Sequence, residues 1–210
     1  AGHQTREFEE RFMREGIPYR VIGGLRFYER QEIRDALAYF RLIVQPFDDL
    51  AFERVINVPK RGLGTATIQT IATHARAKSM PLTHTTLALL ETDEFKPKAR
   101  DALRKFMNDL ERWRQDLGTL SHTEIARAVL DDSGYTAMWQ ADKTPEAQGR
   151  LENLKELVSA MAEFDNMETF LEHVSLVMEN QGQAEQSALS IMTLHGAKGL
   201  EFDTVFLPGW

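Results

Sequence analysis

Apolar residues recur at helical spacing through the middle of the chain. A helix with one buried face is predicted up to the breaker pair Gln45-Pro46, because apolar side chains follow one another at steps of three and four residues (Ile33, Leu37, Phe40 and Val44). The same spacing continues for about five turns between Pro97 and Gly118. Both segments are therefore expected to pack on other helices through their apolar faces.

Polar residues that commonly begin helices mark three further starts. They are Ser121 with Glu124, which has the spacing of a capping box, Thr144-Pro145, and Asp165 with Glu168. Almost all of residues 30–181 is thus expected to be helical.

The beginning of the chain has a different pattern. Residues Gln4 to Glu15 predict a short charged helix that ends at Gly16, a residue that tolerates positive φ. The apolar run from Tyr19 to Ile22 predicts a strand, and Gly23-Gly24 after it predict a hinge.

After Ser187 the apolar period changes to two. Residues 189–194 and 204–207 are predicted to be strands, separated by a glycine-containing turn at His195 to Gly199. The polar stretch Asn180 to Gln186 before them is interpreted as a linker.

These patterns predict a mainly α protein, a multi-helix domain with a few short β-strands contributed by both chain ends. The expected parts are an N-terminal flank at 1–24, a helical insert at 25–186 and a C-terminal flank at 187–210. The β-forming ends are expected to pair with each other or to stay partly loose, since they have few strands to pair with. The chain lacks an initiator Met and starts and ends within apparent elements, which indicates a fragment.

Composition narrows the class of protein. The 210 residues are 42% hydrophobic and 27% charged, values typical of an ordinary globular protein. Because there is no Cys, disulfides, thiolate metal sites and Cys nucleophiles are excluded, and a reducing cytoplasmic location is expected. The sequence has no apolar run long enough to span a membrane.

Charge is distributed unevenly. The net charge of −7 argues against a nucleic-acid binder when the chain is taken as a whole. Between Glu53 and Glu91, however, there are five basic residues and no acidic one, a balance of +5; the other 20 basic residues face 32 acidic ones, a balance of −12. This acid-free window indicates a local anionic partner.

Several kinds of chemistry lack their sequence signatures. There is no G-x-x-x-x-G-K-[ST] phosphate loop, no G-x-G-x-x-G after a strand and no G-x-S-x-G elbow. The six His residues have neither H-x-x-x-H nor H-x-H spacing, so no metal site is predicted. Acidic pairs such as Asp48-Asp49 are expected to be helix caps or solvated charges.

The first group of candidate functional residues lies within the acid-free window. Gly62 and Gly64 permit a tight turn, Thr65 can cap the next helix, and the N–H groups at that helix start would face a ligand. Lys60 and Arg61 add positive charge, a combination that suits a nucleic-acid phosphate bound without base reading. The alternative is a plain turn between two helices. The stretch also resembles the helix-hairpin-helix turns of sequence-independent DNA binders.

A second group of polar residues lies at the end of the strand predicted at 189–194 and in the turn after it. Thr193, His195, Lys198 and Glu201 place a hydroxyl, an imidazole, an ammonium and a carboxylate near one strand end, where ligands of α/β sheets bind. The alternative interpretation is two strands joined by a solvated turn.

Four stretches together resemble one family. Residues 192–202, Met-Thr-Leu-His-Gly-Ala-Lys-Gly-Leu-Glu-Phe, resemble motif V of the UvrD/PcrA/Rep family of superfamily 1 DNA helicases, and residues 19–35 resemble the signature after its motif IV. Gln4-Thr5-Arg6 resembles the tail of motif IV. Residues 60–67 resemble the family's Gly-Ile-Gly-x-x-Thr turn, with Leu63 in place of Ile. The four stretches occur in the family's order.

The resemblance implies that the parent is an ATP-dependent 3′-to-5′ helicase of DNA repair or replication in the bacterial cytoplasm, at the nucleoid. The chain would be the accessory helical insert of the second RecA-like motor domain, with a short piece of that domain at each end. ATP and Mg²⁺ would serve the parent, while this chain would hold no cofactor or metal and would not hydrolyse ATP. The partner would be DNA, as duplex and as single-strand/duplex junction, without sequence preference; repair or transcription proteins are further candidate partners, and a membrane is not.

The resemblance also assigns residues. DNA contacts fall on Lys60, Arg61, Gly62, Leu63, Gly64, Thr65, Thr67, Gln4, Arg6, Thr193, His195 and Lys198; nucleotide contacts fall on Gly199 and Glu201; hinges fall on Gly23 and Gly24. A competing hypothesis is a protein-interaction module whose helical grooves recruit repair or transcription partners. A stand-alone enzyme is disfavoured by the missing signatures.

Overall fold

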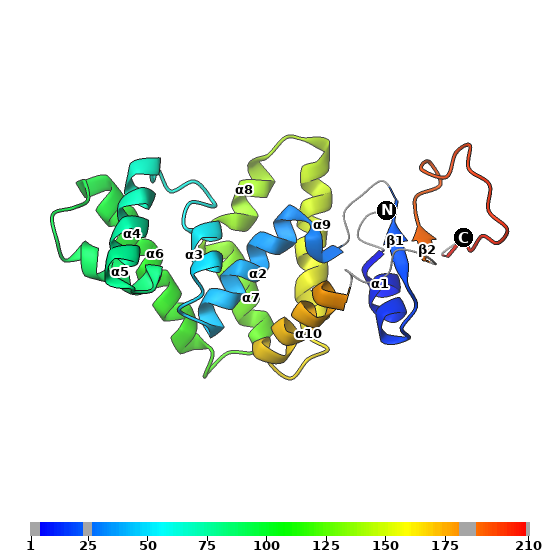
Figure 1. Cartoon of the computed structure of the whole chain (residues 1–210), viewed down its shortest axis with the longest axis horizontal. Coiled ribbons are helices and arrows are strands. Elements are labelled where there is room, and N and C mark those ends of the chain that lie inside the picture. The colour runs from blue at the N-terminus through cyan, green and yellow to red at the C-terminus, as the bar shows by residue number, and fades with distance from the viewer. Residues whose placement is uncertain (1–4, 23–26, 181–187, 209–210) are drawn as a thin grey trace.

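The computed structural model describes residues 5–22, 27–180 and 188–208. Within these residues the chain forms ten α-helices, one short 3₁₀ helix and two strands (Figure 1). The elements are α1 (Thr5–Arg14), β1 (Tyr19–Val21), η1 (Phe27–Glu29), α2 (Gln31–Val44), α3 (Asp49–Val55), α4 (Thr65–Lys78), α5 (Leu82–Leu90), α6 (Pro97–Asp116), α7 (His122–Asp132), α8 (Tyr135–Ala141), α9 (Pro145–Met161), α10 (Met167–Asn180) and β2 (Leu189–Ile191). The predicted mainly α fold class is confirmed.

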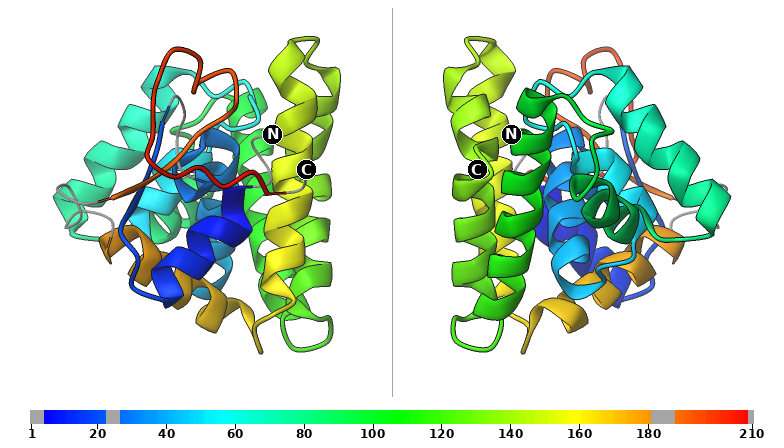
Figure 2. Two further views of the ribbon diagram at one scale, coloured as in Figure 1. Left: turned by 90° about the vertical axis from the view of Figure 1, so that its right-hand side faces the viewer. Right: turned by 90° about the vertical axis from the view of Figure 1, so that its left-hand side faces the viewer.

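The helices from α2 to α10, with η1, form one unit that we call the helical body. Its apolar cluster begins at Phe27 and ends at Val177 among the described residues. Helix α2 runs through the centre and contacts α3, α6, α7, α9 and α10. Figure 2 shows α7, α8 and α9 packed together along one side of the molecule. Large side chains such as Trp113 and Tyr39 are fully buried, and each contributes about 1.5–3 kcal/mol through removal of apolar surface from water.

Two carboxylates of α2 lie inside the helical body and are paired there. Asp35 lies 2.7 Å from the Arg54 guanidinium and accepts a hydrogen bond of 2.9 Å from the Tyr135 hydroxyl. Burial is the main cause that raises the pKa of Asp35, and these two partners oppose the rise. Glu32 lies 3.0 Å from Arg150 in the same way. Partners of this kind are required because an unpaired buried charge is strongly destabilising.

Most predicted helix starts are confirmed. Ser121 and Glu124 form both hydrogen bonds of a capping box at α7, and α9 begins at Pro145. The start predicted at Asp165 is wrong by one residue. The side chain of Asn166 accepts a 2.9 Å hydrogen bond from the Thr169 amide at the beginning of α10.

The chain ends pair with each other, as one of the two expectations had it. β1 and β2 form a parallel pair with Tyr19 opposite Leu189. The second predicted strand, 204–207, is wrong: those residues form no strand in the part of the chain that is described. Phe206 is 80% exposed, and a strand needs a neighbour to receive its backbone hydrogen bonds.

Three expectations fall on residues outside the described ranges. These are the hinge at Gly23 and Gly24, the contact assigned to Gln4, and most of the linker at 180–186. Among the helices that are described, none is long and apolar enough to cross a membrane.

Candidate nucleic-acid interface

The turn between α3 and α4, residues 57–64, lies on the outer part of the helical body, away from α1 and β2 (Figure 1). Gly62 has a φ of +73°, a conformation that side chains with a Cβ rarely adopt, so a glycine is required there. Gly64 is extended, with a φ of −76°, and a Cβ placed on it would meet no described atom within 4 Å. Gly64 is thus exposed to solvent, and its backbone conformation is one that other residues also adopt.

Asn57 holds the turn closed. Its Nδ2 donates a 2.9 Å hydrogen bond to the Leu63 carbonyl, and its Oδ1 accepts one of 2.9 Å from the Arg61 amide. Leu63 itself is 4% exposed and belongs to the apolar cluster of the helical body. The backbone around Gly62 is therefore fixed from both sides.

Arg61 points into the protein. Its guanidinium donates hydrogen bonds to the carbonyls of Val55 (2.7 Å) and Ile56 (3.1 Å) and lies 4.4 Å from the centre of the Phe106 ring. It also donates to the Tyr39 hydroxyl, which donates in turn to the Val58 carbonyl. Burial is the main cause that raises the pKa of Tyr39, which keeps this hydroxyl protonated. The guanidinium expected on a phosphate is instead used to hold the turn.

Two lysines lie beside the glycine turn. Lys60 is exposed at its tip. Lys98, at the beginning of α6, is also exposed, and a Cβ placed on Gly62 would stand 3.9 Å from its Cε. Sequence reasoning missed Lys98 because it lies 36 residues beyond Gly62 and outside the acid-free window. The packing of α6 against α5, together with the contact of Phe106 in α6 with Arg61 of the turn, brings it there.

The start of α4 differs from expectation by one residue. Gly64, not Thr65, occupies the N-cap position, and no side chain among the described residues caps this end. The Gly64 carbonyl accepts a 3.0 Å hydrogen bond from the half-buried Thr67. The amides of Thr65 and Ala66, both exposed residues, precede the first helical hydrogen bond of α4.

The five cations of the acid-free window do not form one surface. Arg54 lies 2.7 Å from Asp35 in the interior, and Arg61 also points inward. Arg76 and Lys78 are exposed at the far end of α4. Among these five described residues, only Lys60 has its charged group exposed at the turn. Lys98, from outside the window, lies beside it.

The second group of candidate residues forms an exposed turn. Thr193 Oγ1 accepts a 3.0 Å hydrogen bond from the Gly196 amide, and its carbonyl accepts one of 3.0 Å from Ala197. The assigned residues His195, Lys198, Gly199 and Glu201 are exposed, with Gly199 at a φ of +84°. Within the described ranges no group of three or more His, Asp and Glu side chains is placed to hold a metal.

The structure keeps the two groups apart. Figure 1 shows the α3–α4 turn in one half of the molecule and the 193–201 segment at the opposite end, beyond β2. Arg6, which the family resemblance places among the DNA contacts, is 4% exposed and lies 2.7 Å from Glu156 of α9. Its guanidinium is therefore engaged within the protein in this conformation.

The fold and the turn define a class: a mainly helical module that presents one rigid, cationic glycine turn to solvent. The chain belongs to the UvrD-like helicase C-terminal domain family, whose sequence profile matches residues 1–210. This confirms the resemblance to the UvrD/PcrA/Rep helicases.

Named relatives agree with this family. The chain is 47% identical over 212 residues to DNA helicase II of Rickettsia typhi, an alignment that covers 100% of this chain and 32% of that protein. It is 39% identical to DNA helicase II of Escherichia coli, and 37% identical to the ATP-dependent DNA helicase PcrA of Bacillus subtilis; each alignment covers 98% of this chain and 30% of the relative. The chain thus spans about a third of the length of these relatives.

Proposed function

We propose that this chain is the duplex-docking accessory part of an ATP-dependent 3′-to-5′ DNA helicase that serves DNA repair or replication. The observation that carries the proposal is the α3–α4 turn, which is fixed from inside by Arg61 and Asn57 and flanked outside by Lys60 and Lys98. The names of the relatives, DNA helicase II and PcrA, support a DNA partner.

The chemistry of the turn suits a phosphate of the DNA backbone. Two ammonium groups supply charge, and the open amides of Thr65 and Ala66 supply donors at the positive end of α4. At Gly64 the missing side chain leaves room for a close approach. None of these groups reads a base edge, so docking on duplex or on a junction would be independent of sequence.

ATP and Mg²⁺ belong to the parent helicase in this proposal. The chain contains no phosphate loop, and the described residues offer one lysine and one carboxylate on the exposed 193–201 turn. That set is too small to enclose a triphosphate and its metal ion. Thr193, His195 and Lys198 would line single-stranded DNA, Gly199 and Glu201 would form one edge of the nucleotide site, and the chain alone would not hydrolyse ATP.

The proposed domain boundaries follow the packing. Residues 25–186 form the accessory insert, and 1–24 and 187–210 are flanks of the second motor domain. The apolar cluster supports this division, because it runs from Phe27 to Val177 and includes no described residue of either flank.

One observation favours the alternative, a protein-interaction module. Phe47, between α2 and α3, and Leu50, in the first turn of α3, are 58% and 76% exposed. Apolar side chains in such a position can anchor a partner, although single exposed ones are common on protein surfaces. The DNA-binding experiment below separates the two functions.

The test is a titration of the chain against a duplex with a single-stranded 3′ tail, by fluorescence anisotropy at several salt concentrations. If Lys60 and Lys98 each neutralise a phosphate, log affinity falls with log salt at a slope of about −2, from about −0.9 per phosphate. Lys60→Ala and Lys98→Ala should each flatten the slope by about 1. Lys155→Ala, which removes an exposed lysine of α9, is the matched control and should leave the slope unchanged.

A different result would overturn the proposal. If the native chain and the three variants bind equally weakly with no dependence on salt, the turn does not dock DNA. The interaction module would then be the better account of this chain.

A further inference from the structure

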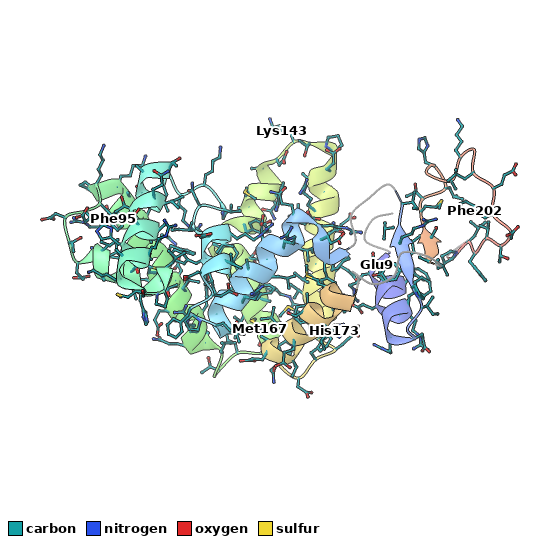
Figure 3. The ribbon with its side chains drawn as sticks, viewed as in Figure 1. Glu9, Phe95, Lys143, Met167, His173 and Phe202 are labelled. Atoms are coloured by element: carbon teal, nitrogen blue, oxygen red, sulfur yellow. The ribbon has the colours of Figure 1, made fainter. Side chains whose placement is uncertain are left out.

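Helix α1 meets the helical body through charged side chains. Arg6, Glu9 and Glu10 lie at spacings of three and four residues, so they share one face of the helix. Arg6 and Glu9 are 4% and 2% exposed. Figure 3 labels Glu9 on the side of α1 nearest the helical body.

Arg6 bridges α1 to α9 and the residues just after it. Its Nε lies 2.7 Å from Glu156 Oε1, and one terminal nitrogen lies 3.8 Å from Glu163 Oε1. The other terminal nitrogen lies 2.9 Å from Glu10 Oε1, within α1. One planar guanidinium thus joins three carboxylates that approach it from different sides.

The two glutamates of α1 complete the contact at η1. Glu10 Oε1 accepts a 2.7 Å hydrogen bond from the Tyr28 hydroxyl, and Glu9 Oε2 accepts one of 3.2 Å from the Phe27 amide. Helix α1 is therefore tied to two separate elements of the helical body by directional polar contacts.

The aromatic side chains of α1 contact each other and β1. The ring of Phe12 lies 6.5 Å from that of Phe8 and 6.0 Å from that of Tyr19 in β1, measured between ring centres. No described side chain of α1 is part of the apolar cluster of the body. Among the described residues the flank keeps these rings within itself, and its contacts with the body there are polar, of the kind that can open without exposing a core.

From this geometry we infer that Arg6, with Glu156 and Glu163, forms a releasable latch that sets the orientation of α1 and the β1–β2 pair relative to the helical body. Arg6 is a positioning residue, and it acts on the orientation of the whole flank. The latch stands on contacts within the chain alone. Only its consequence, the direction in which the glycine turn faces DNA, rests on the function proposed above.

The charges explain why the latch would open as a unit. The Arg6 side chain is 5% exposed, while the side chains of Glu156 and Glu163 are 28% and 57% exposed. Loss of its partners would leave a buried, unpaired cation, which is unfavourable. Separation of α1 from α9 returns the guanidinium and the carboxylates to water together, where each is hydrated.

The test measures orientation directly. Because the chain has no Cys, nitroxide labels can be attached at Arg14→Cys on α1 and Arg127→Cys on α7, two exposed positions, and their distance distribution read by pulsed electron resonance. The unchanged chain should give one narrow distance. Arg6→Gln should broaden or shift it, and so should the double change Glu156→Gln/Glu163→Gln.

A matched control is available on the same helix. Arg11 lies 2.9 Å from Glu15, also within α1, so Arg11→Gln removes the same charge without touching the helical body and should leave the distance unchanged. A narrow, unshifted distribution in Arg6→Gln would overturn the latch. A fall of roughly 6–20 °C in the melting temperature of the helical body in Arg6→Gln would also overturn it. Such a fall would show that Arg6 stabilises the fold of the body itself and does not only orient the flank.

The outcome is independent of DNA docking. The distances are measured without DNA, so a latch that fails leaves the salt slopes of Lys60→Ala and Lys98→Ala to decide the proposed function. If DNA binding shows no dependence on salt, the label-to-label distances still decide whether the latch exists.

Discussion

At the scale of single residues, the two glycines of the turn are glycine for different reasons. Gly62 has a φ of +73°, whereas Gly64 is extended and open to solvent. We expect Gly62→Ala to lower the free energy of unfolding by about 1–2 kcal/mol, because an L side chain is strained at positive φ. Gly64→Ala should cost up to about 1 kcal/mol, because Gly64 is the N-cap residue of α4 and alanine is a poorer N-cap than glycine. It should also weaken DNA binding, because its methyl group would stand where the phosphate approaches.

Urea denaturation and anisotropy titration of the two variants check this pair. Each glycine serves as the control for the other, since both changes add the same methyl group two residues apart. Unchanged DNA affinity in a folded Gly64→Ala variant would contradict a close approach of the phosphate at this point.

Neighbouring residues of the turn also show what a sequence can and cannot predict. Lys60 and Arg61 are adjacent cations in the same acid-free window, yet one is exposed and the other bonds to carbonyls inside. Gly62 and Gly64 predicted the place of the turn correctly, since it lies between α3 and α4. The charge pattern indicated only that cations are present. It did not predict the direction of each side chain, because that depends on Tyr39 and Asn57, which a charge pattern does not reveal.

At the scale of elements, the capping box of α7 is a measurable case. The Ser121 hydroxyl donates a 2.6 Å hydrogen bond to Glu124, and this bond is the first cause that lowers the pKa of Glu124. Ser121→Ala should therefore raise that pKa toward its ordinary value and lower the melting temperature by roughly 2–4 °C, as expected for a lost N-cap. An NMR titration of the Glu124 carboxyl and thermal unfolding measure the two effects.

The pH dependence follows from the sign of the shift. A carboxyl whose pKa is lower in the folded state stabilises the protein above its unfolded pKa, and this contribution is lost as pH falls through the folded pKa. The difference in stability between the native chain and Ser121→Ala should thus be largest near neutral pH and narrow in acid, where the contribution of the Ser121–Glu124 carboxylate bond is lost and that of the backbone cap remains. Ser159→Ala, an exposed serine within α9, should show no such convergence; a constant difference for Ser121→Ala would rule out Glu124 as the partner.

Helix periods were predicted well and helix starts less well. The apolar faces of α2 and α6 are long enough to be unambiguous, but the caps at α4 and α10 each lie one residue from the predicted position. Gly and Thr, or Asp and Asn, are neighbouring residues that can both cap. The strand predicted at 204–207 failed for another reason, because pairing depends on a partner strand that local pattern does not contain.

At the scale of the whole molecule, the division between body and flanks predicts that the body is self-sufficient. Its apolar cluster lies within residues 27–177, and its described contacts with α1 are polar. A chain of residues 25–180 should therefore unfold cooperatively. Its melting temperature should lie within about 4 °C of that of the body in the full chain, because a loss of about 1 kcal/mol lowers the melting temperature of a domain of this size by about 2–4 °C.

The same shortened chain should keep the salt slope of DNA binding, because Lys60, Lys98 and α4 all lie in the body. Thermal unfolding and anisotropy titration of the two chains test both statements. A shortened chain that folds but loses the slope would place part of the docking surface on the flanks, where Lys198 and His195 are the exposed candidates. A shortened chain that fails to fold would show that α1 and the β1–β2 pair support the core itself, and the polar contacts at Arg6 would then belong to one cooperative unit.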